Sequence, residues 1–363
     1  MIAVLAAAPY GAVGCSAEDR GNAMKRMLSV LVVGALASGL MTARASAAGV
    51  ATNPLASTMT AAQDVVSYWF ADGGANLRNA TPYGVQTAVT GEVLPGPGAP
   101  GDTKPGMIAP QPGGAGGRTP TASGKVFFVT SDGQPHWCTG TAVQSQYRNL
   151  VATAGHCVYD ITRDSTLAKW VFVPGYSDGV IPSGLYVGKQ AFSDYEFGVY
   201  HDFDDDYAFA TVYNGVIATA EGEPADAGRL GDRVNALGLA WSQPLGDRVD
   251  VFGYPAGAHP DGKRPYSGER LESSRGETVS AAVPGLPAEA LVAVKSSFTG
   301  EGALGSSWIL HYQDGIGHLN GITISVADTD GDQRYDTSAS PYFDGELAQV
   351  HKAAGSSWSG RVV

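Results

Sequence analysis

The chain has 363 residues and a formal net charge of −12 at pH 7, from 23 Lys and Arg against 35 Asp and Glu. This length is ample for one large domain or two ordinary ones. Only 16% of the residues are charged, while 49 are Gly and 21 are Pro, a composition that suits short strands joined by many turns. This composition argues against coiled coils and helical bundles. Nucleic acid is excluded as a partner, because most of the surface would repel a phosphate backbone.

The N-terminal region is typical of a secretory signal. Met24 is followed by Lys25 and Arg26 and then by an apolar run over residues 27–40. This run is shorter than the roughly 20 residues that a membrane-spanning helix needs. Small residues precede position 48, as at a signal cleavage site. We therefore expect a signal peptide over 24–47, cleavage after Ala47, and a secreted, extracellular protein with no membrane span.

The chain has three cysteines. Cys15 lies in residues 1–23, which we interpret as an upstream extension from a mis-assigned start; a lipoprotein signal ending at Cys15 is the alternative. Removal of residues 1–47 leaves Cys138 and Cys157, 19 positions apart. In an oxidising compartment these two are expected to form a disulfide, with two buried thiols as the alternative.

The composition changes near residue 124. Residues 48–123 hold one short helical pattern at 61–70 and then a linker rich in Gly and Pro. Since this segment lacks a core of its own, we expect it to be pro-like or loosely attached. Over residues 124–363, short β-type runs alternate with turn residues, which favours an all-β barrel or sandwich. Residues 345–354 suit a short helix.

Two segments of the domain carry residues suited to catalysis. Gly155-His156-Cys157 places a histidine just after a β-type run, beside a cysteine able to pair with Cys138. A histidine held in this way can act as a general base. Fifty residues later, Asp206 stands at the start of an apolar run, where a half-buried carboxylate could orient the imidazole. The rest of this acidic run is expected to be a solvated turn: Asp202, Asp204 and Asp205.

These residues resemble the trypsin and chymotrypsin class of serine peptidases, in its secreted actinobacterial branch. The resemblance covers residues 124–350. It implies two six-stranded antiparallel β-barrels packed face to face, with His156 and Asp206 from the first barrel meeting a nucleophile from the second. It also implies a peptide or protein substrate, peptide-bond hydrolysis and no required cofactor, and we expect a monomer. The matching motifs are Thr153-Ala154-Gly155-His156-Cys157, Asp206-Tyr207-Ala208 and the Gly-rich stretch before Trp308.

The chain departs from this family at the nucleophile. The family pattern is Gly-x-Ser-Gly, and the corresponding stretch is Gly302-Ala303-Leu304-Gly305, so Leu304 stands in the place of the serine. A leucine has no lone pair with which to attack a carbonyl, which closes the acyl-enzyme route at this position. The amides of Gly302 and Leu304 could still form an oxyanion hole. We therefore expect a catalytically impaired or inactive family member that retains a peptide-binding cleft.

Two other interpretations stay open. An active serine endopeptidase could use Ser306 or Ser307, although neither frame keeps both glycines of the family pattern. Alternatively, the chain is a non-catalytic surface protein whose barrels only present loops.

An acidic stretch near the C-terminus has the spacing of a calcium loop. Asp328, Asp330, Asp332 and Asp336 stand at positions 1, 3, 5 and 9, which lets carboxylates converge on one hard cation. Position 6, where such loops turn on Gly, is Gln333, and position 12 is not Glu. Calcium and a plain acidic turn both stay open.

Overall fold

The computed structural model describes residues 49–84, 88–90, 94–96, 98, 104–114 and 121–363. The expected signal peptide, its cleavage after Ala47, the upstream extension and Cys15 lie outside the described residues.

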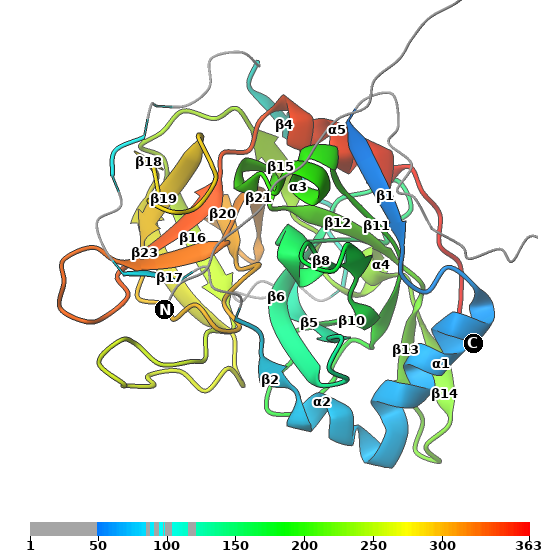
Figure 1. Cartoon of the computed structure of the whole chain (residues 1–363). Coiled ribbons are helices and arrows are strands. Elements are labelled where there is room, and N and C mark those ends of the chain that lie inside the picture. The colour runs from blue at the N-terminus through cyan, green and yellow to red at the C-terminus, as the bar shows by residue number, and fades with distance from the viewer. Residues whose placement is uncertain (1–48, 85–87, 91–93, 97, 99–103, 115–120) are drawn as a thin grey trace, which may run out of the picture. The chain divides into compact units, whose positions relative to one another are not determined.

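The first half of the domain is a closed antiparallel barrel of six strands (Figure 1). Around the barrel the order is β10, β5, β6, β7, β12 and β11, and the pairing of β11 with β10 closes it. Strand β12 is buried along its whole length, as an apolar run inside a barrel should be. The strands are β5 (Ser123–Val129), β6 (Pro135–Val143), β7 (Leu150–Thr153), β10 (Ala168–Pro174), β11 (Tyr186–Asp194) and β12 (Ala208–Val212).

The second half is barrel-like and consists of two sheets. One has the order β17, β16, β20, β21, β15, β4, and the other β18, β19, β23, β22, β3. The chain passes from one sheet to the other across Thr278, between β17 and β18, so the two sheets share a corner. The strands of these two sheets are β3 (Ala88–Thr90), β4 (Gly106–Ile108), β15 (Gly238–Trp241), β16 (Arg248–Gly253), β17 (Glu272–Glu277), β18 (Val279–Ala281), β19 (Leu291–Lys295), β20 (Ser307–Gln313), β21 (Ile316–Ile322), β22 (Ser325–Asp328) and β23 (Thr337–Pro341).

The predicted fold class is thereby confirmed, with two differences in detail. The second half is divided into two sheets, and β15 pairs with β21 in parallel where an antiparallel pairing was expected. Several short elements connect these strands. They are β8 (Tyr159–Asp160), β9 (Ser165–Thr166), β13 (Gly215–Ala218), β14 (Pro224–Gly228), α2 (Ala75–Asn79), α3 (Tyr195–Tyr200), α4 (Leu230–Arg233) and the 3-10 turns η1 (Ala71–Gly73), η2 (Gly155–Cys157) and η3 (Phe203–Asp205).

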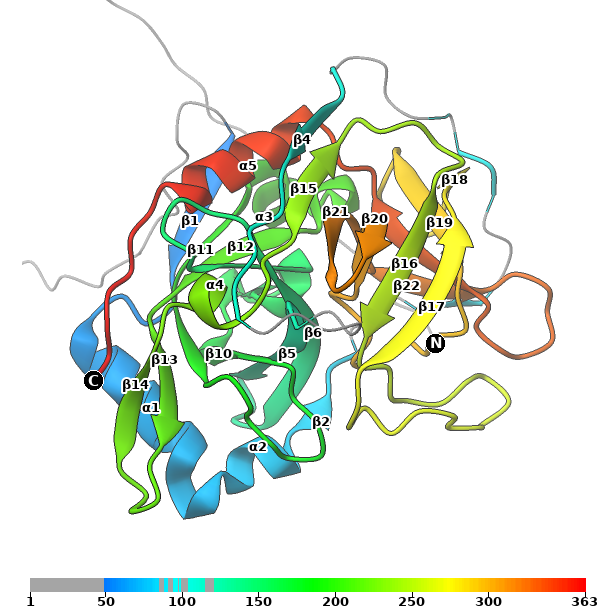
Figure 2. The same cartoon turned by 180° about the vertical axis from the view of Figure 1, so that it is seen from behind.

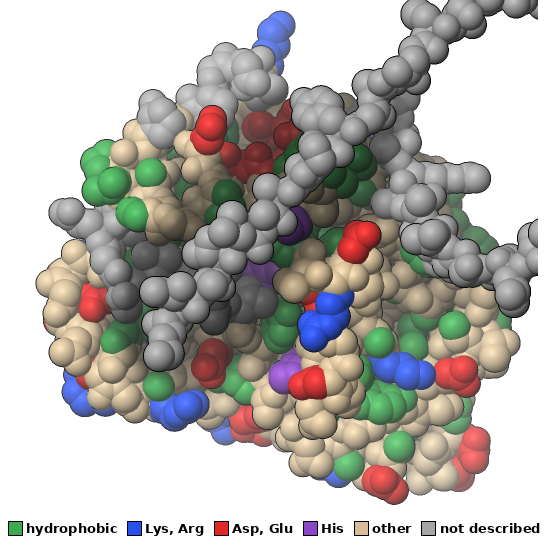
Figure 3. All heavy atoms as spheres, in the orientation of Figure 1, with side chains coloured by type: hydrophobic (Ala, Val, Ile, Leu, Met, Phe, Trp, Pro, Cys, Tyr) green, Lys and Arg blue, Asp and Glu red, His purple; other side chains and the backbone are tan. Residues whose placement is uncertain are grey.

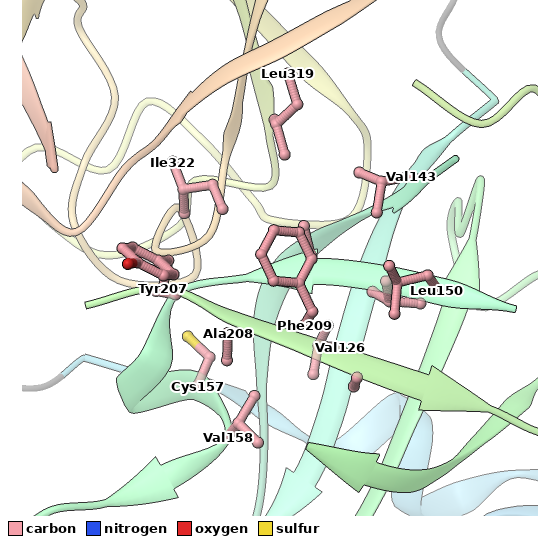
Figure 4. Close-up of a cluster of buried hydrophobic side chains, with 14 of the residues drawn as sticks. Val126, Val143, Leu150, Cys157, Val158, Tyr207, Ala208, Phe209, Leu319 and Ile322 are labelled. Atoms are coloured by element: carbon pink, nitrogen blue, oxygen red, sulfur yellow. The ribbon is translucent and has the colours of Figure 1, made fainter. Parts of the chain in front are cut away.

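The two halves share a hydrophobic core. Leu319 and Ile322 of β21 point toward Phe209 of β12 and toward Tyr207, which directly precedes β12, and all four side chains are buried (Figure 4). The C-terminal helix expected near residues 345–354 is α5 (Gly345–Gly355), which begins where the Asp344 side chain accepts hydrogen bonds from two backbone amides.

Residues 49–84 pack against the first barrel through β1, α1 and β2 (Thr81–Pro82). The sequence favoured a loosely attached segment here. β1 (Val50–Pro54) pairs with β11 over five residues. Helix α1 (Met59–Phe70), drawn from two sides in Figures 1 and 2, lies against β10 and β11. Trp69 of this helix is fully buried, and its indole N–H donates to the Lys169 carbonyl at 2.6 Å. Removal of the segment in the mature protein stays a prediction.

The fold predicts that Trp69 matters for stability. Trp69→Ala removes a large, fully buried side chain, so the free energy of unfolding should fall by about 3–5 kcal/mol in a urea titration. Met59→Ala, on the same helix at 48% exposure, is the matched control and should change it by less than about 0.5 kcal/mol. An unchanged unfolding midpoint in Trp69→Ala would show that α1 is detached in solution.

Candidate active site

The turn that carries His156 is held in place from two sides. β7 ends at Thr153, and residues 155–157 form the single 3-10 turn η2. The predicted disulfide joins Cys157 to Cys138 of β6, with a Cα–Cα distance of 6.2 Å, and both cysteines are buried. A Cβ on Gly155 would lie 2.9 Å from Asp206 Oδ1, so only glycine allows the approach of the carboxylate.

His156 and Asp206 form a buried hydrogen-bonded pair. His156 Nδ1 lies 2.5 Å from Asp206 Oδ2, and the His156 backbone N–H donates to Asp206 Oδ1 at 2.9 Å. The two residues are 3% and 0% exposed. Because an ionised carboxylate can only accept, Nδ1 carries the proton and Nε2 is left as the basic nitrogen.

The basic nitrogen has no hydrogen-bond donor beside it in the part of the chain that the structure describes. His156 Nε2 is buried and has no hydrogen-bond partner among the described residues. Buried polar atoms are rarely left in this state. The imidazole is therefore oriented as a general base, without a donor from which to take a proton.

The loop over residues 302–305 lies beside this turn. The Thr139 N–H donates to the Leu304 carbonyl at 2.8 Å, and Thr139 directly follows the disulfide-bonded Cys138. Leu304 is fully buried and belongs to the same hydrophobic cluster as Cys138 and Cys157. The loop also approaches the end of β7, since a Cβ on Gly305 would lie 2.5 Å from Thr153 Oγ1. The structure thus brings the loop that carries Leu304 against β6 and the end of β7, the strand that precedes His156.

Both glycines of this loop are required by the backbone. Gly302 and Gly305 have φ values of 74° and 85°. A Cβ would lie 2.1 Å from the Trp137 ring at Gly302, and 2.0 Å from the Thr139 carbonyl oxygen at Gly305. The loop therefore keeps the geometry for which the two glycines are needed, although Leu304 stands between them.

The amide of Gly302, one of the two expected oxyanion donors, is already engaged. It donates to the Tyr83 carbonyl at 3.1 Å. Tyr83 was not among the residues predicted from the sequence. Nothing in the local pattern around it signals a contact with a loop more than 200 positions away.

The hydroxyls of the two alternative serines are held elsewhere. Ser306 Oγ donates to the Ala303 carbonyl at 2.5 Å, and Ser307 Oγ lies 3.4 Å from Ser123 Oγ. Both serines are fully buried.

The acidic run around Asp206 is less solvated than expected. The expectation is wrong for Asp205, which is only 7% exposed. Burial, together with the nearby Asp194, raises the pKa of Asp205 to about 8. Asp204 accepts from the amides of Glu289 and Ala290 and so ties this run to the second half of the domain.

Three of the four candidate calcium ligands are brought together. Carboxylate oxygens of Asp328, Asp330 and Asp332 lie within 4.8 Å of one another. Asp336 is turned to a different partner, since its Oδ2 lies 2.7 Å from Lys295 Nζ. Calcium binding here stays a prediction.

Asp205 gives the structure a testable pH dependence. Its pKa is raised in the folded chain above the ordinary 3.8, so the stability it contributes is fully present below pH 3.8 and is lost as the pH rises through about 8. In Asp205→Asn this loss is removed, and at pH 9 the variant should melt at least about 2 °C above the natural chain. The exposed Asp72→Asn is the control and should follow the natural chain from pH 5 to 9. Parallel melting curves for all three proteins would contradict a buried Asp205 carboxyl.

The surface and the helices bear on possible partners. On the face drawn in Figure 3, Lys and Arg side chains are dispersed among acidic and neutral ones. No helix in the described ranges is long and apolar enough to cross a membrane.

Known proteins resemble this chain in structure. No protein-family model and no curated protein sequence matches it. The chain is similar to the crystal structure of the protease Anisep from Arthrobacter nicotinovorans, with 24% identity, a TM-score of 0.54, and coverage of 67% of this chain and 99% of that one. It is also similar to a thermostable serine protease from an extremophilic microorganism, with 28% identity, a TM-score of 0.53, and coverage of 66% and 99%. The chain has the chymotrypsin fold of these trypsin-like serine proteases.

Proposed function

We propose that the chain is a secreted member of the trypsin-like serine peptidase family that has lost its nucleophile and retains a peptide-binding cleft. The observation that carries this proposal is the buried His156–Asp206 pair, whose Nε2 has no hydrogen-bond partner among the described residues. In a serine peptidase, this nitrogen accepts the proton of the attacking serine hydroxyl. Leu304 is the residue that stands in the corresponding loop.

The proposed loss of activity follows from the chemistry of residue 304. Acylation begins when an oxygen attacks the scissile carbonyl while the histidine takes up its proton. A leucine side chain offers neither the lone pair nor the proton. An oxyanion hole without a nucleophile accelerates hydrolysis only slightly above the rate in water, so a bound peptide would remain essentially uncut.

The compartment and the ligand belong to the same proposal. A buried disulfide between Cys138 and Cys157 supports an oxidising, extracellular location. The fold supports a peptide or protein segment as the ligand. We propose in addition that the chain is a monomer and needs no cofactor. The loop-presenting alternative makes no use of the His156–Asp206 geometry, and the use of Ser306 or Ser307 is disfavoured by the hydrogen bonds that hold them.

The proposal predicts that one substitution restores reactivity. Leu304→Ser should place a hydroxyl within reach of His156 Nε2, and the end-point labelling of the folded variant by a fluorophosphonate should exceed that of the natural chain by at least about a thousandfold. Mass spectrometry of the intact protein measures the covalent adduct.

The control combines Leu304→Ser with His156→Gln, which removes the base while keeping a side chain of similar size, and it should not be labelled. Labelling of the natural chain that disappears in Ser306→Ala or Ser307→Ala would show an active peptidase. A folded Leu304→Ser variant without any adduct would favour the loop-presenting protein.

A further inference from the structure

A short stretch of the N-terminal segment lies against the candidate site. β2 (Thr81–Pro82) pairs in parallel with His136 and Trp137 at the start of β6. The Tyr83 N–H donates to the Trp137 carbonyl at 2.8 Å, which extends this pairing by one residue. Thr81 Oγ1 also lies 2.9 Å from His136 Nδ1.

From this position, Tyr83 contacts the loop over residues 302–305. Its carbonyl accepts from the Gly302 N–H, which is the amide expected to stabilise an oxyanion. Its ring packs edge-on against Phe128, with the centroids 5.0 Å apart. Burial raises the pKa of the Tyr83 phenol to about 12, and the carboxylates of Asp160 and Asp206 add to the rise. Tyr83 is therefore held between the Gly302 amide on one side and Phe128 and the Trp137 carbonyl on the other.

The chain continues from Tyr83 onto the second half of the domain. Gly84 lies against Glu301, since a Cβ on Gly84 would be 2.9 Å from Glu301 Cγ. β3 then pairs in parallel with β22 over three residues. Residues 85–87, between these two contacts, lie outside the described residues.

These contacts cover two strand edges. β7 pairs with β6 only over Thr141–Val143, so β2 covers the start of β6. β22 is the last strand of its sheet apart from β3. Free strand edges of this kind are where an extended peptide adds to a protein through its backbone.

The contacts of residues 81–84 and 88–90 are weaker than those of the parts of the chain on either side of them. Before these residues comes helix α1, whose Trp69 is fully buried. After them, Leu94 exchanges two backbone hydrogen bonds with Ala282. The pairings of β2 and β3 involve two and three residues and are parallel, the less stable arrangement per residue. Among the described residues, β2 and β3 are therefore the weakest attachments of this segment.

We propose that residues 81–84 and 88–90, here called the strap, inhibit the cleft by taking the place of an extended peptide. A peptide ligand then binds only when the strap is displaced. This inference rests on the proposed function, because it takes the cleft to be a peptide site.

Hydrogen exchange tests the strap in the natural chain without any catalytic readout. Tyr83→Pro removes the donor to the Trp137 carbonyl, and the amides of Gly302 and of β22 should then exchange at least about tenfold faster, while amides of β12 stay unchanged. Tyr83→Phe keeps the backbone donor, the acceptor and the ring, and is the matched control expected to exchange like the natural chain. A Gly302 amide that is unprotected in the natural chain, or equally protected in Tyr83→Pro, would overturn the inference.

A reversible covalent lock tests whether the strap controls access. A Cβ on Gly84 would lie 3.8 Å from Glu301 Cβ, which is the usual separation in a disulfide. In the Leu304→Ser background, G84C/E301C should react with a fluorophosphonate at least about tenfold faster after mild reduction than in the oxidised form. The matched control is G84S/E301S, whose rate should not respond to the reductant.

The outcomes separate the strap from the proposed function. Equal labelling rates for the locked and reduced forms would overturn the strap while leaving the peptidase proposal intact. No adduct in any form, with exchange at Gly302 still accelerated in Tyr83→Pro, would overturn the peptidase proposal and leave the strap as the occupant of the site. Cleavage of Leu304→Ser after Tyr83 would show that the strap binds as a substrate, and would overturn its inhibitory role.

Discussion

The hydrogen bonds between His156 and Asp206 are the interaction on which the site depends. A buried carboxylate is costly unless it is well paired, and Asp206 meets this requirement with one backbone N–H and one imidazole N–H from the same residue. The pair forms because Thr153 at the end of β7 lies opposite Ala208 at the start of β12, which brings the two loops together. The disulfide then holds the histidine turn to β6.

This arrangement leaves a nitrogen that the fold does not satisfy. A buried acceptor without a partner costs about 1–3 kcal/mol, so His156 Nε2 is a position where the structure is not optimised for stability alone. The second half of the domain brings Leu304 and the Gly302 amide to the same place, and the N-terminal segment brings the Tyr83 carbonyl. The candidate site is therefore assembled from three parts of the chain: the turn that carries His156, the loop over residues 302–305, and Tyr83.

The sequence is sufficient where the signal is local. His156 beside Cys157, Asp206 before an apolar run, and glycines on both sides of Leu304 are short patterns, and the structure brings all three together. The sequence is insufficient where segments far apart in the chain determine the surroundings of a residue. β1 is stabilised by β11, roughly 140 positions away, so residues 49–84 read as a segment without a core. The sequence predicts a solvated Asp205, because the residues near it in the structure, among them Asp194 and Glu346, come from other elements.

The most direct test of the account is the state of the His156 ring, measured by ¹⁵N nuclear magnetic resonance of the natural chain and of Leu304→Ser. We predict that Nδ1 carries the proton in both proteins, and that Nε2 carries no proton and accepts no hydrogen bond in the natural chain. In Leu304→Ser, the Nε2 resonance should shift to that of a nitrogen accepting a hydrogen bond. A proton on Nε2 in the natural chain, or an Nε2 resonance that does not respond to the serine, would contradict the proposal that residue 304 lies next to His156 Nε2.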